Sequence, residues 1–216
     1  MTNQAYEAIN QFVTETSPST EAMEAARAHA EEFGLRVPSV PVGQLITTLT
    51  AVAQGDKVQA VAITPVSSIV GLYLLEGLGK NGIVTCIDPE AEHQAHAKET
   101  FRKAGHSPAR IRFLPSRPLD VMSRLANDSY QVIYADVAPL DLPAVVKAAW
   151  PLLAPHGTLV LPDVLLDATI ADTSRTDRAT AAAREADSYL QDLEGAQITR
   201  LPLGSGLTLA TKLATS

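Results

Sequence analysis

The sequence predicts an α/β fold in which helices cover both faces of a mostly parallel sheet. From about residue 57, short apolar runs alternate with helical segments, a repeat that is typical of a doubly wound sheet. The apolar runs lack polar alternation, as expected of parallel strands that are buried on both faces. Near the C-terminus, two further runs flank Gly204-Ser205-Gly206, which predicts an antiparallel hairpin. We therefore expect one domain over residues 1–216, with helices in 1–54 and the α/β core in 55–216.

The N-terminal segment is predicted to form three helices. In the first helix, apolar side chains recur three or four residues apart and form one face, which would dock either on the chain's own domain or on a second copy. These side chains are Tyr6, Ile9, Phe12 and Val13. In order, the expected elements are a helix over 4–14, a helix over 21–33 that stops at Gly34, a stiff connector over 37–43 and a helix over 44–54.

The core segment is predicted to contain five parallel strands, each followed by a helix, and then the hairpin. The expected strands cover 58–64, 82–88, 110–115, 130–136 and 157–163. The expected helices cover 68–78, 91–105, 118–126, 142–153 and, with a polar composition, 173–193. The hairpin strands are expected at 198–203 and 207–213.

Composition excludes several classes of partner. The net charge is -7, from 17 basic and 24 acidic residues, and no Lys/Arg cluster interrupts it. Neither nucleic acid nor an anionic membrane is therefore an expected partner, because both need a basic surface. The N-terminus lacks a signal-peptide pattern and no apolar stretch reaches membrane-spanning length, so we expect a cytoplasmic protein. The one cysteine, Cys86, lies in an apolar run where a buried, inert thiol is expected.

Chemistry is expected where the parallel strands end, since ligands of open α/β sheets bind beyond the carboxyl ends of the strands. Five places meet that condition: residues 64–68, Asp88, Ser116-Arg117, Asp136 and Asp163. The Asp88 carboxylate could accept hydrogen bonds from both ribose hydroxyls of a nucleotide-like cofactor. The alternative is that Asp88 only caps the helix that follows it.

Two further pairs of residues have side chains that could bind a metal ion. Asp136 and Asp163 end neighbouring strands, and two carboxylates there could share a divalent cation such as Mg²⁺ or Ca²⁺; otherwise each caps a loop and stays solvated. His93 and His96 lie one helical turn apart, a spacing that can chelate a metal, although their helix is expected to face solvent.

The chain resembles the catechol/caffeoyl-CoA type of O-methyltransferase, particularly its small actinobacterial members. The resemblance runs from about residue 20 to the end, and its most specific parts are LDLPAVVKAAWPLLAPHGTLVLPD and LPLGSGLTLATK. It implies a Rossmann-like sheet of about seven strands. It also implies a homodimer that binds S-adenosylmethionine and methylates a hydroxyl of a small-molecule acceptor, often with a divalent cation orienting that hydroxyl.

The resemblance also assigns expected roles to individual residues. Asp88 falls on the ribose carboxylate, and Asp136 falls on the first metal-binding aspartate near the methionine part, where it is the expected catalytic residue. Asp163 falls on a metal-ligand position where the family has asparagine. The remaining expected cofactor contacts are Val42 near the methionine end, Thr64 and Ser68 in the cofactor loop, and Arg117 in the loop that borders the adenine.

The departures from the family pattern leave the function open. The glycine-rich cofactor loop is replaced by residues 62–68, in which Ala62 stands for an acid. Pro162 replaces a second metal aspartate, and Pro139 replaces a lysine that acts as a base in some members.

We therefore consider two functions. One is a working S-adenosylmethionine-dependent O-methyltransferase with a remodelled loop. The other is a catalytically inactive, dimeric binding or scaffold protein whose pocket is partly filled by Pro65 and Val66. A dinucleotide-binding oxidoreductase is less favoured, because no Gly-x-Gly-x-x-Gly follows the first strand.

Overall fold

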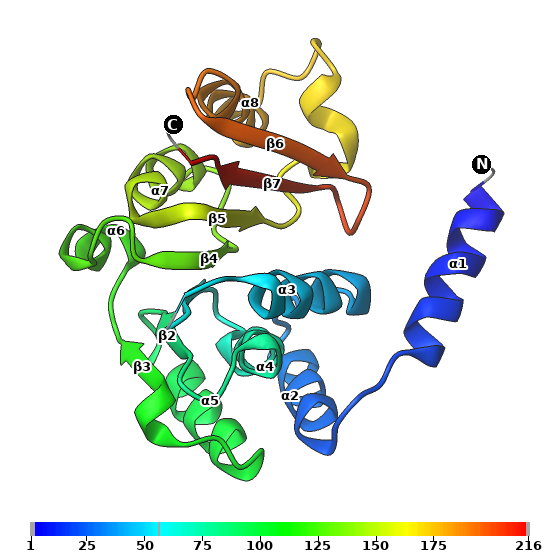
Figure 1. The fold of residues 1–216 in the computed structure, drawn as a ribbon. Coiled ribbons are helices and arrows are strands. Elements are labelled where there is room, and N and C mark those ends of the chain that lie inside the picture. Colours follow the sequence, from blue (N-terminus) through cyan, green and yellow to red (C-terminus); the bar gives the residue numbers. More distant parts are fainter. Residues whose placement is uncertain (1–2, 56, 215–216) are drawn as a thin grey trace.

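The sheet is mostly parallel and ends in an antiparallel pair, as the sequence predicts. The computed structural model describes residues 3–55 and 57–214. Within these residues the strands form one seven-stranded sheet in the order β3-β2-β1-β4-β5-β7-β6. β1 pairs in parallel with β2 and β4, β2 with β3, and β4 with β5, whereas β7 is antiparallel to both β5 and β6. Figure 1 shows the doubly wound Rossmann-like arrangement, with helices on both sides of this sheet.

The elements follow the expected order. The strands are β1 (Gln59–Ile63), β2 (Ile83–Ile87), β3 (Ile111–Leu114), β4 (Tyr130–Ala135), β5 (Leu153–Leu161), β6 (Ala196–Leu201) and β7 (Leu207–Lys212). The α-helices are α1 (Asn3–Thr16), α2 (Glu21–Glu32), α3 (Val40–Val52), α4 (Ser67–Gly77), α5 (Ala91–Lys103), α6 (Pro118–Val121), α7 (Leu142–Ala149) and α8 (Arg178–Gln191). The 3₁₀ turns are η1 (Pro108–Arg110), η2 (Met122–Arg124), η3 (Trp150–Leu152) and η4 (Leu166–Ala171).

Several boundaries differ from the predicted ones, and three of the helix and strand starts move by four or five residues. α3 begins at Val40, inside the stretch expected to be a connector, because Pro41 lies in its first turn, where no amide donor is needed. α8 begins only at Arg178, since the Asp177 carboxylate accepts a hydrogen bond from Thr180 N at 3.0 Å and caps the helix there. β5 begins at Leu153, earlier than residue 157.

The two faces of the sheet carry separate cores. On β1, the small side chains of Ala60 and Ala62 face the core formed with α2, α3, α4 and α5. Val61 and Ile63 face the opposite core, formed with α7 and α8. Residues 60–63 of β1 are thus buried on both faces of the sheet, which explains their apolar sequence. Helix α4 packs against the small side chains and is buried along most of its length.

α1 lies apart from the body of the fold (Figure 1). The Tyr6 hydroxyl donates a hydrogen bond to the carbonyl of Pro202 in the β6–β7 turn. Ile9 and Phe12 on the expected apolar face remain 52% and 65% exposed. That face is thus only partly covered by its own chain. Among residues 3–55 and 57–214, no helix combines the length and apolar character needed to cross a membrane.

The segment after β5 has an unusual backbone. Four of its residues, none of them glycine, have positive φ angles: Asp163 (54°), Leu166 (50°), Asp167 (52°) and Ala168 (67°). The β6–β7 turn holds this segment, since Asp167 N donates to Ser205 O at 3.0 Å and Ser205 N donates to Asp163 Oδ1 at 2.6 Å. Left-handed backbone at residues with a Cβ is strained, so the segment lowers the stability of the fold.

Replacing Ala168 by glycine should relieve part of that strain. We expect Ala168→Gly to stabilise the protein by about 0.5–1 kcal/mol, because glycine adopts φ > 0 without a Cβ clash. The same change at exposed Ala181 within α8 should destabilise by about 0.5–1 kcal/mol, since glycine is a poor helix former. Chemical denaturation of both variants measures the two effects. If Ala168→Gly and Ala181→Gly lost the same amount of stability, Ala168 would not be strained in the native protein.

Candidate functional site

The carboxyl ends of β1, β2 and β4 meet at one cavity of about 580 Å³, called here the main strand-end cavity. Parallel pairing of β1 with both neighbours brings Thr64, Asp88 and Asp136 to the same edge of the sheet. Asp136 N donates to Ile63 O at 2.9 Å, which continues the β1–β4 ladder past the last strand residue. The lining residues are Ile63, Thr64, Pro65, Ile87, Asp88, Pro89, Arg117, Pro118, Leu119, Asp120, Asp136, Val137, Ala138, Asp141 and Val145.

Asp88 is 5% exposed at the tip of β2, and both of its carboxylate oxygens have partners. Oδ1 accepts a hydrogen bond from Glu90 N at 3.1 Å, and Oδ2 lies 2.6 Å from His93 Nδ1. These contacts tie Asp88 to the start of α5, but its carboxylate is not the cap of that helix, because Glu90 is the N-cap residue. A carboxylate oxygen can accept two hydrogen bonds, so each oxygen keeps capacity for one more donor from the cavity.

The loop over residues 64–68 does not use the backbone conformations that glycine would provide. None of its residues has a positive φ, so Thr64 and Val66 adopt angles that β-branched residues accept. Val66 N donates to Thr64 Oγ1 at 3.3 Å. Val66 itself is 1% exposed in the core and does not line the cavity, so of the two residues expected to fill the pocket only Pro65 faces it.

A second cavity, called here the side cavity, adjoins the first and measures about 390 Å³. Four residues line both cavities: Pro65, Asp136, Val137 and Ala138. The charged side chains of the side cavity are Arg36, Asp136 and Asp163, and its remaining wall is apolar. Asp136 thus lies at the boundary between two chambers.

Asp136 is the electrostatically perturbed group of the site. Burial, followed by the neighbouring charge of Asp163, raises the pKa of the Asp136 carboxyl from 3.8 to about 6. The Arg36 charge and a hydrogen bond from Thr64 act in the opposite direction on the Asp136 pKa. The Asp163 carboxylate is held by the β6–β7 turn through the Ser205 amide. Asp136 can therefore take up or release a proton in the range where enzymes use acid–base groups.

The structure brings together five of the expected site residues. Thr64, Asp88, Arg117 and Asp136 line the main strand-end cavity, and Asp163 lines the side cavity with Asp136. Two expected cofactor contacts lie elsewhere. Val42 is 3% exposed and packs in the core, and Ser68 is 5% exposed in the first turn of α4; neither lines the two cavities.

The two histidines of α5 contact different elements. His93 lies against Asp88, whereas the His96 ring stacks on His29 of α2 with centroids 3.4 Å apart. In the described part of the chain, no group of three or more His, Cys, Asp or Glu side chains is placed to share a metal ion. The expected buried cysteine is confirmed, since burial raises the pKa of the Cys86 thiol to about 12.

Sequence reasoning missed Arg36, Asp120 and Asp141, which also line the cavities. Asp120 and Asp141 could have been found, because each lies at the start of a helix that follows a parallel strand. Arg36 could not, since it lies in the α2–α3 connector, which carries no motif.

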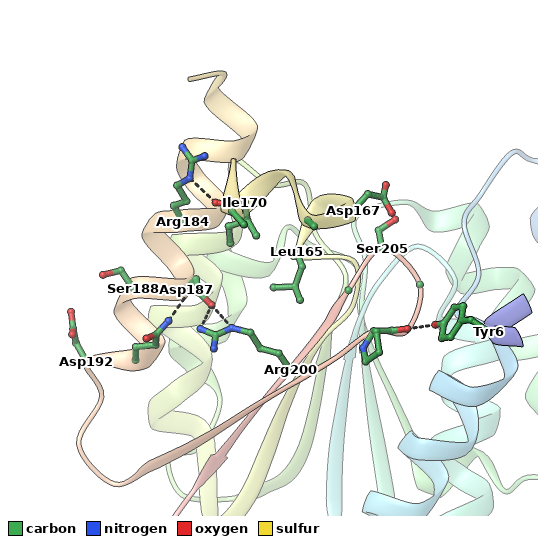
Figure 2. A pocket seen from close by; sticks show the side chains of 16 residues that line it. Tyr6, Leu165, Asp167, Ile170, Arg184, Asp187, Ser188, Asp192, Arg200 and Ser205 are labelled. Carbon is green, nitrogen blue, oxygen red and sulfur yellow. Dashed lines mark hydrogen bonds and ion pairs between the residues drawn. The ribbon is translucent and has the colours of Figure 1, made fainter. Parts of the chain in front are cut away.

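A cavity of about 880 Å³, larger than either strand-end cavity, lies away from the strand ends, between η4, α8 and the hairpin, with Tyr6 of α1 beside it (Figure 2). Its basic side chains are already engaged. Arg184 donates to the carbonyls of Ile170, Asp172 and Arg175, and Arg200 pairs with Asp187 at 2.7 Å. Size alone would favour this cavity, but it lies away from the carboxyl ends of the parallel strands, where ligands of open α/β sheets bind. The strand-end cavities are therefore the better candidate site.

Comparison with known proteins finds relatives that match most of the chain. A family model described as O-methyltransferase matches residues 23–213. A relative in Mycobacterium leprae, named as a predicted O-methyltransferase, is 35% identical over 187 residues, which are 87% of this chain and 83% of the relative.

Solved structures extend the comparison. A crystal structure of a Corynebacterium glutamicum protein is 55% identical, with a TM-score of 0.95 over 98% of this chain and 99% of that one. The O-methyltransferase TomG from Streptomyces achromogenes, involved in tomaymycin synthesis and solved with S-adenosylmethionine, has a TM-score of 0.83 at 20% identity, covering 99% of this chain and 100% of that one. At that identity the likeness to TomG concerns the fold. Given the match over residues 23–213 and the 35% identical relative, the chain belongs to the O-methyltransferase family.

Proposed function

We propose that this protein is an S-adenosylmethionine-dependent O-methyltransferase that acts on a hydroxyl of a small molecule. The observation that carries the proposal is the pair of adjoining strand-end cavities, with Asp88 in the larger one and Asp136 at their boundary. Volumes of about 580 and 390 Å³ suit a nucleoside-sized donor beside a small acceptor. We further propose that residues 1–216 act as one domain, in the cytoplasm and without a nucleic-acid partner.

The residues of the main strand-end cavity fit the cofactor. The free acceptor capacity of the two Asp88 oxygens matches two ribose hydroxyls. Arg117 and Pro118 line the same cavity beyond the end of β3, where the adenine would rest. The Thr64 side chain is hydrogen-bonded to Asp136, near which the methionine part would lie. When bound, S-adenosylmethionine supplies the methyl group on an electrophilic sulfonium.

The boundary residue Asp136 is the proposed catalytic group. Its carboxylate would accept the proton of the acceptor hydroxyl, whose oxygen then forms the new bond to carbon while the sulfur–carbon bond breaks. The raised pKa of Asp136 makes its carboxylate a stronger base than an ordinary aspartate. The apolar walls of the side cavity would hold the acceptor in line with the methyl group, and such alignment supplies much of the rate in methyl transfer.

The residues present do not fit a resident Mg²⁺ or Ca²⁺. Asp136 and Asp163 are the carboxylates available, and Asp163 Oδ1 already accepts the Ser205 amide at 2.6 Å. Pro162, beside them, has no side-chain oxygen, and the Arg36 guanidinium shares their cavity. Ca²⁺ takes six to eight oxygen ligands, and Mg²⁺ needs one or two well-placed carboxylates in an octahedron completed by water, whereas here one of the two carboxylates is already engaged and a guanidinium lies beside the pair. We therefore propose a reaction that does not require a bound cation.

A homodimer is the assembly that the family resemblance implies. The exposed apolar side chains of Ile9 and Phe12 on α1 support it, because a second copy could cover them.

Binding of S-adenosylhomocysteine, measured by calorimetry, tests the cofactor role of Asp88. Asp88→Asn should weaken binding by about tenfold to a hundredfold, since charge-assisted bonds to the ribose hydroxyls are lost. The matched control is Glu92→Gln, which removes one negative charge from the exposed surface of the same region and should leave the affinity unchanged.

Two outcomes would contradict this proposal. One is failure of the wild-type protein to bind either S-adenosylmethionine or S-adenosylhomocysteine, which would favour the inactive scaffold instead. The other is equal affinity in Asp88→Asn and wild type.

Chelation tests the independence from metal ions. Methyl transfer to a phenolic acceptor, followed by formation of S-adenosylhomocysteine, should be unchanged by a chelator and should not rise with added Mg²⁺ or Ca²⁺. A loss of activity on chelation that either ion restores would contradict this proposal and would show that the reaction needs a bound cation.

The buried charge of Asp136 should also lower the stability of the native protein. Because its native pKa lies above the value in the unfolded chain, the associated stability is fully present below about pH 4 and is lost as the pH rises through about 6. Asp136→Asn should therefore be more stable than wild type by about 1–3 kcal/mol at neutral pH and above, with the advantage vanishing in acid. Urea denaturation of wild type and Asp136→Asn, at neutral pH and below about pH 4, measures the difference in the free energy of unfolding. A pH-independent difference would contradict it.

A further inference from the structure

Arg36 is held in a defined place by the end of α2. Gly34, with φ of 65°, follows the helix, and Leu35 N donates to Ala30 O at 2.8 Å while Gly34 N donates to Glu31 O at 3.0 Å. This pair of bonds is the Schellman arrangement that fixes the direction of the departing chain. Leu35 then packs against the core, so the position of Arg36 does not depend on its own side-chain contacts.

The residues after Arg36 are anchored as well. Val37 packs against the same core, and the buried Pro38 accepts a hydrogen bond from Arg27 Nη1 at 3.2 Å through its carbonyl. Arg36 lies between two inward-facing neighbours and is exposed. Its side chain lines the side cavity.

The Arg36 guanidinium has no hydrogen bond or ion pair with any residue in 3–55 or 57–214, so its five N–H donors are available. It interacts electrostatically with Asp136 but forms no ion pair with it. Arg184 and Arg200 differ in this respect, since carbonyls or a carboxylate occupy them. Arg36 is therefore free to bind a ligand.

The unpaired guanidinium of Arg36 is the positive charge that an ionised acceptor would need in the side cavity. An acceptor oxygen that has lost its proton is an anion. The Asp163 carboxylate of the side cavity would repel it, and so would Asp136 whenever Asp136 is ionised. Among the residues lining that cavity, Arg36 carries the one positive charge. Without it, ionisation of the acceptor would be strongly disfavoured where the methyl group is to be received.

We propose that Arg36 binds the ionised acceptor oxygen and thereby makes its deprotonation feasible in a site without a metal ion. This inference rests on the proposed methyltransferase function. In the reaction the acceptor O–H proton leaves to Asp136 or solvent, the oxygen–carbon bond forms and the sulfur–carbon bond breaks. Arg36 stays protonated throughout. The ether product carries no charge on that oxygen, so its attraction to Arg36 is lost and release is favoured.

The test uses 4-nitrophenol, whose ionised form is coloured, as a probe of the side cavity in protein saturated with S-adenosylhomocysteine. No methyl donor is present, so only binding is measured. Wild-type protein should bind the phenolate more tightly than the neutral phenol and lower the apparent pKa of the bound probe. Arg36→Gln should bind the phenolate about tenfold to a hundredfold more weakly. Its affinity for uncharged 4-nitroanisole should not change, and Arg36→Lys should retain part of the preference.

The control is Arg178→Gln, which removes an exposed arginine that lines neither strand-end cavity and should behave as wild type. Equal phenolate binding by wild type and Arg36→Gln, or no phenolate binding by the wild-type complex, overturns the inference. Either result with normal S-adenosylhomocysteine affinity leaves the proposed function intact. Failure of S-adenosylhomocysteine to bind any variant would overturn both together.

Discussion

The parallel pairing of β1 with β4 is the constraint on which the rest of the site depends. It continues past the strands through the bond from Asp136 N to Ile63 O, at 2.9 Å. That bond places Asp136 next to the loop that follows β1 and makes it a wall of two cavities at once. Pairing of β1 with β2 on its other side adds Asp88 to the same edge. The sheet therefore decides which side chains can cooperate before any loop geometry is considered.

The packed core offsets two local features that each lower the free energy of unfolding, a buried carboxylate and a strained backbone segment. Asp136 is held in a site where burial and Asp163 oppose its ionisation, and the segment after β5 carries a run of left-handed residues. Both features lie around the side cavity, and the hairpin holds the second one in place. Buried charge and backbone strain of this kind persist only where the surrounding structure imposes them, which is common at functional sites.

Much of the fold could be predicted from the sequence because local patterns and burial agree. The uninterrupted apolar runs predicted the parallel strands, and Gly204-Ser205-Gly206 predicted the hairpin turn. Asp88 and Asp136 followed from the same patterns, since a parallel sheet brings strand ends together. Positions that depend on tertiary placement could not be predicted this way. Val42 lies in the core, and Arg36 reaches the side cavity only because the α2–α3 connector is anchored beside it.

The loop over residues 64–68, which replaces the family's glycine-rich loop, does not close the main strand-end cavity. None of its residues has a positive φ angle. Of Pro65 and Val66, Val66 is buried in the core and only Pro65 lines the two strand-end cavities.

A crystal structure of the protein with S-adenosylhomocysteine is the most direct test of the proposed cofactor site. We expect the ribose to lie on Asp88, the adenine near Arg117 and the sulfur beside Asp136. S-adenosylhomocysteine bound in the cavity of Figure 2, or bound without contact to Asp88, would contradict it.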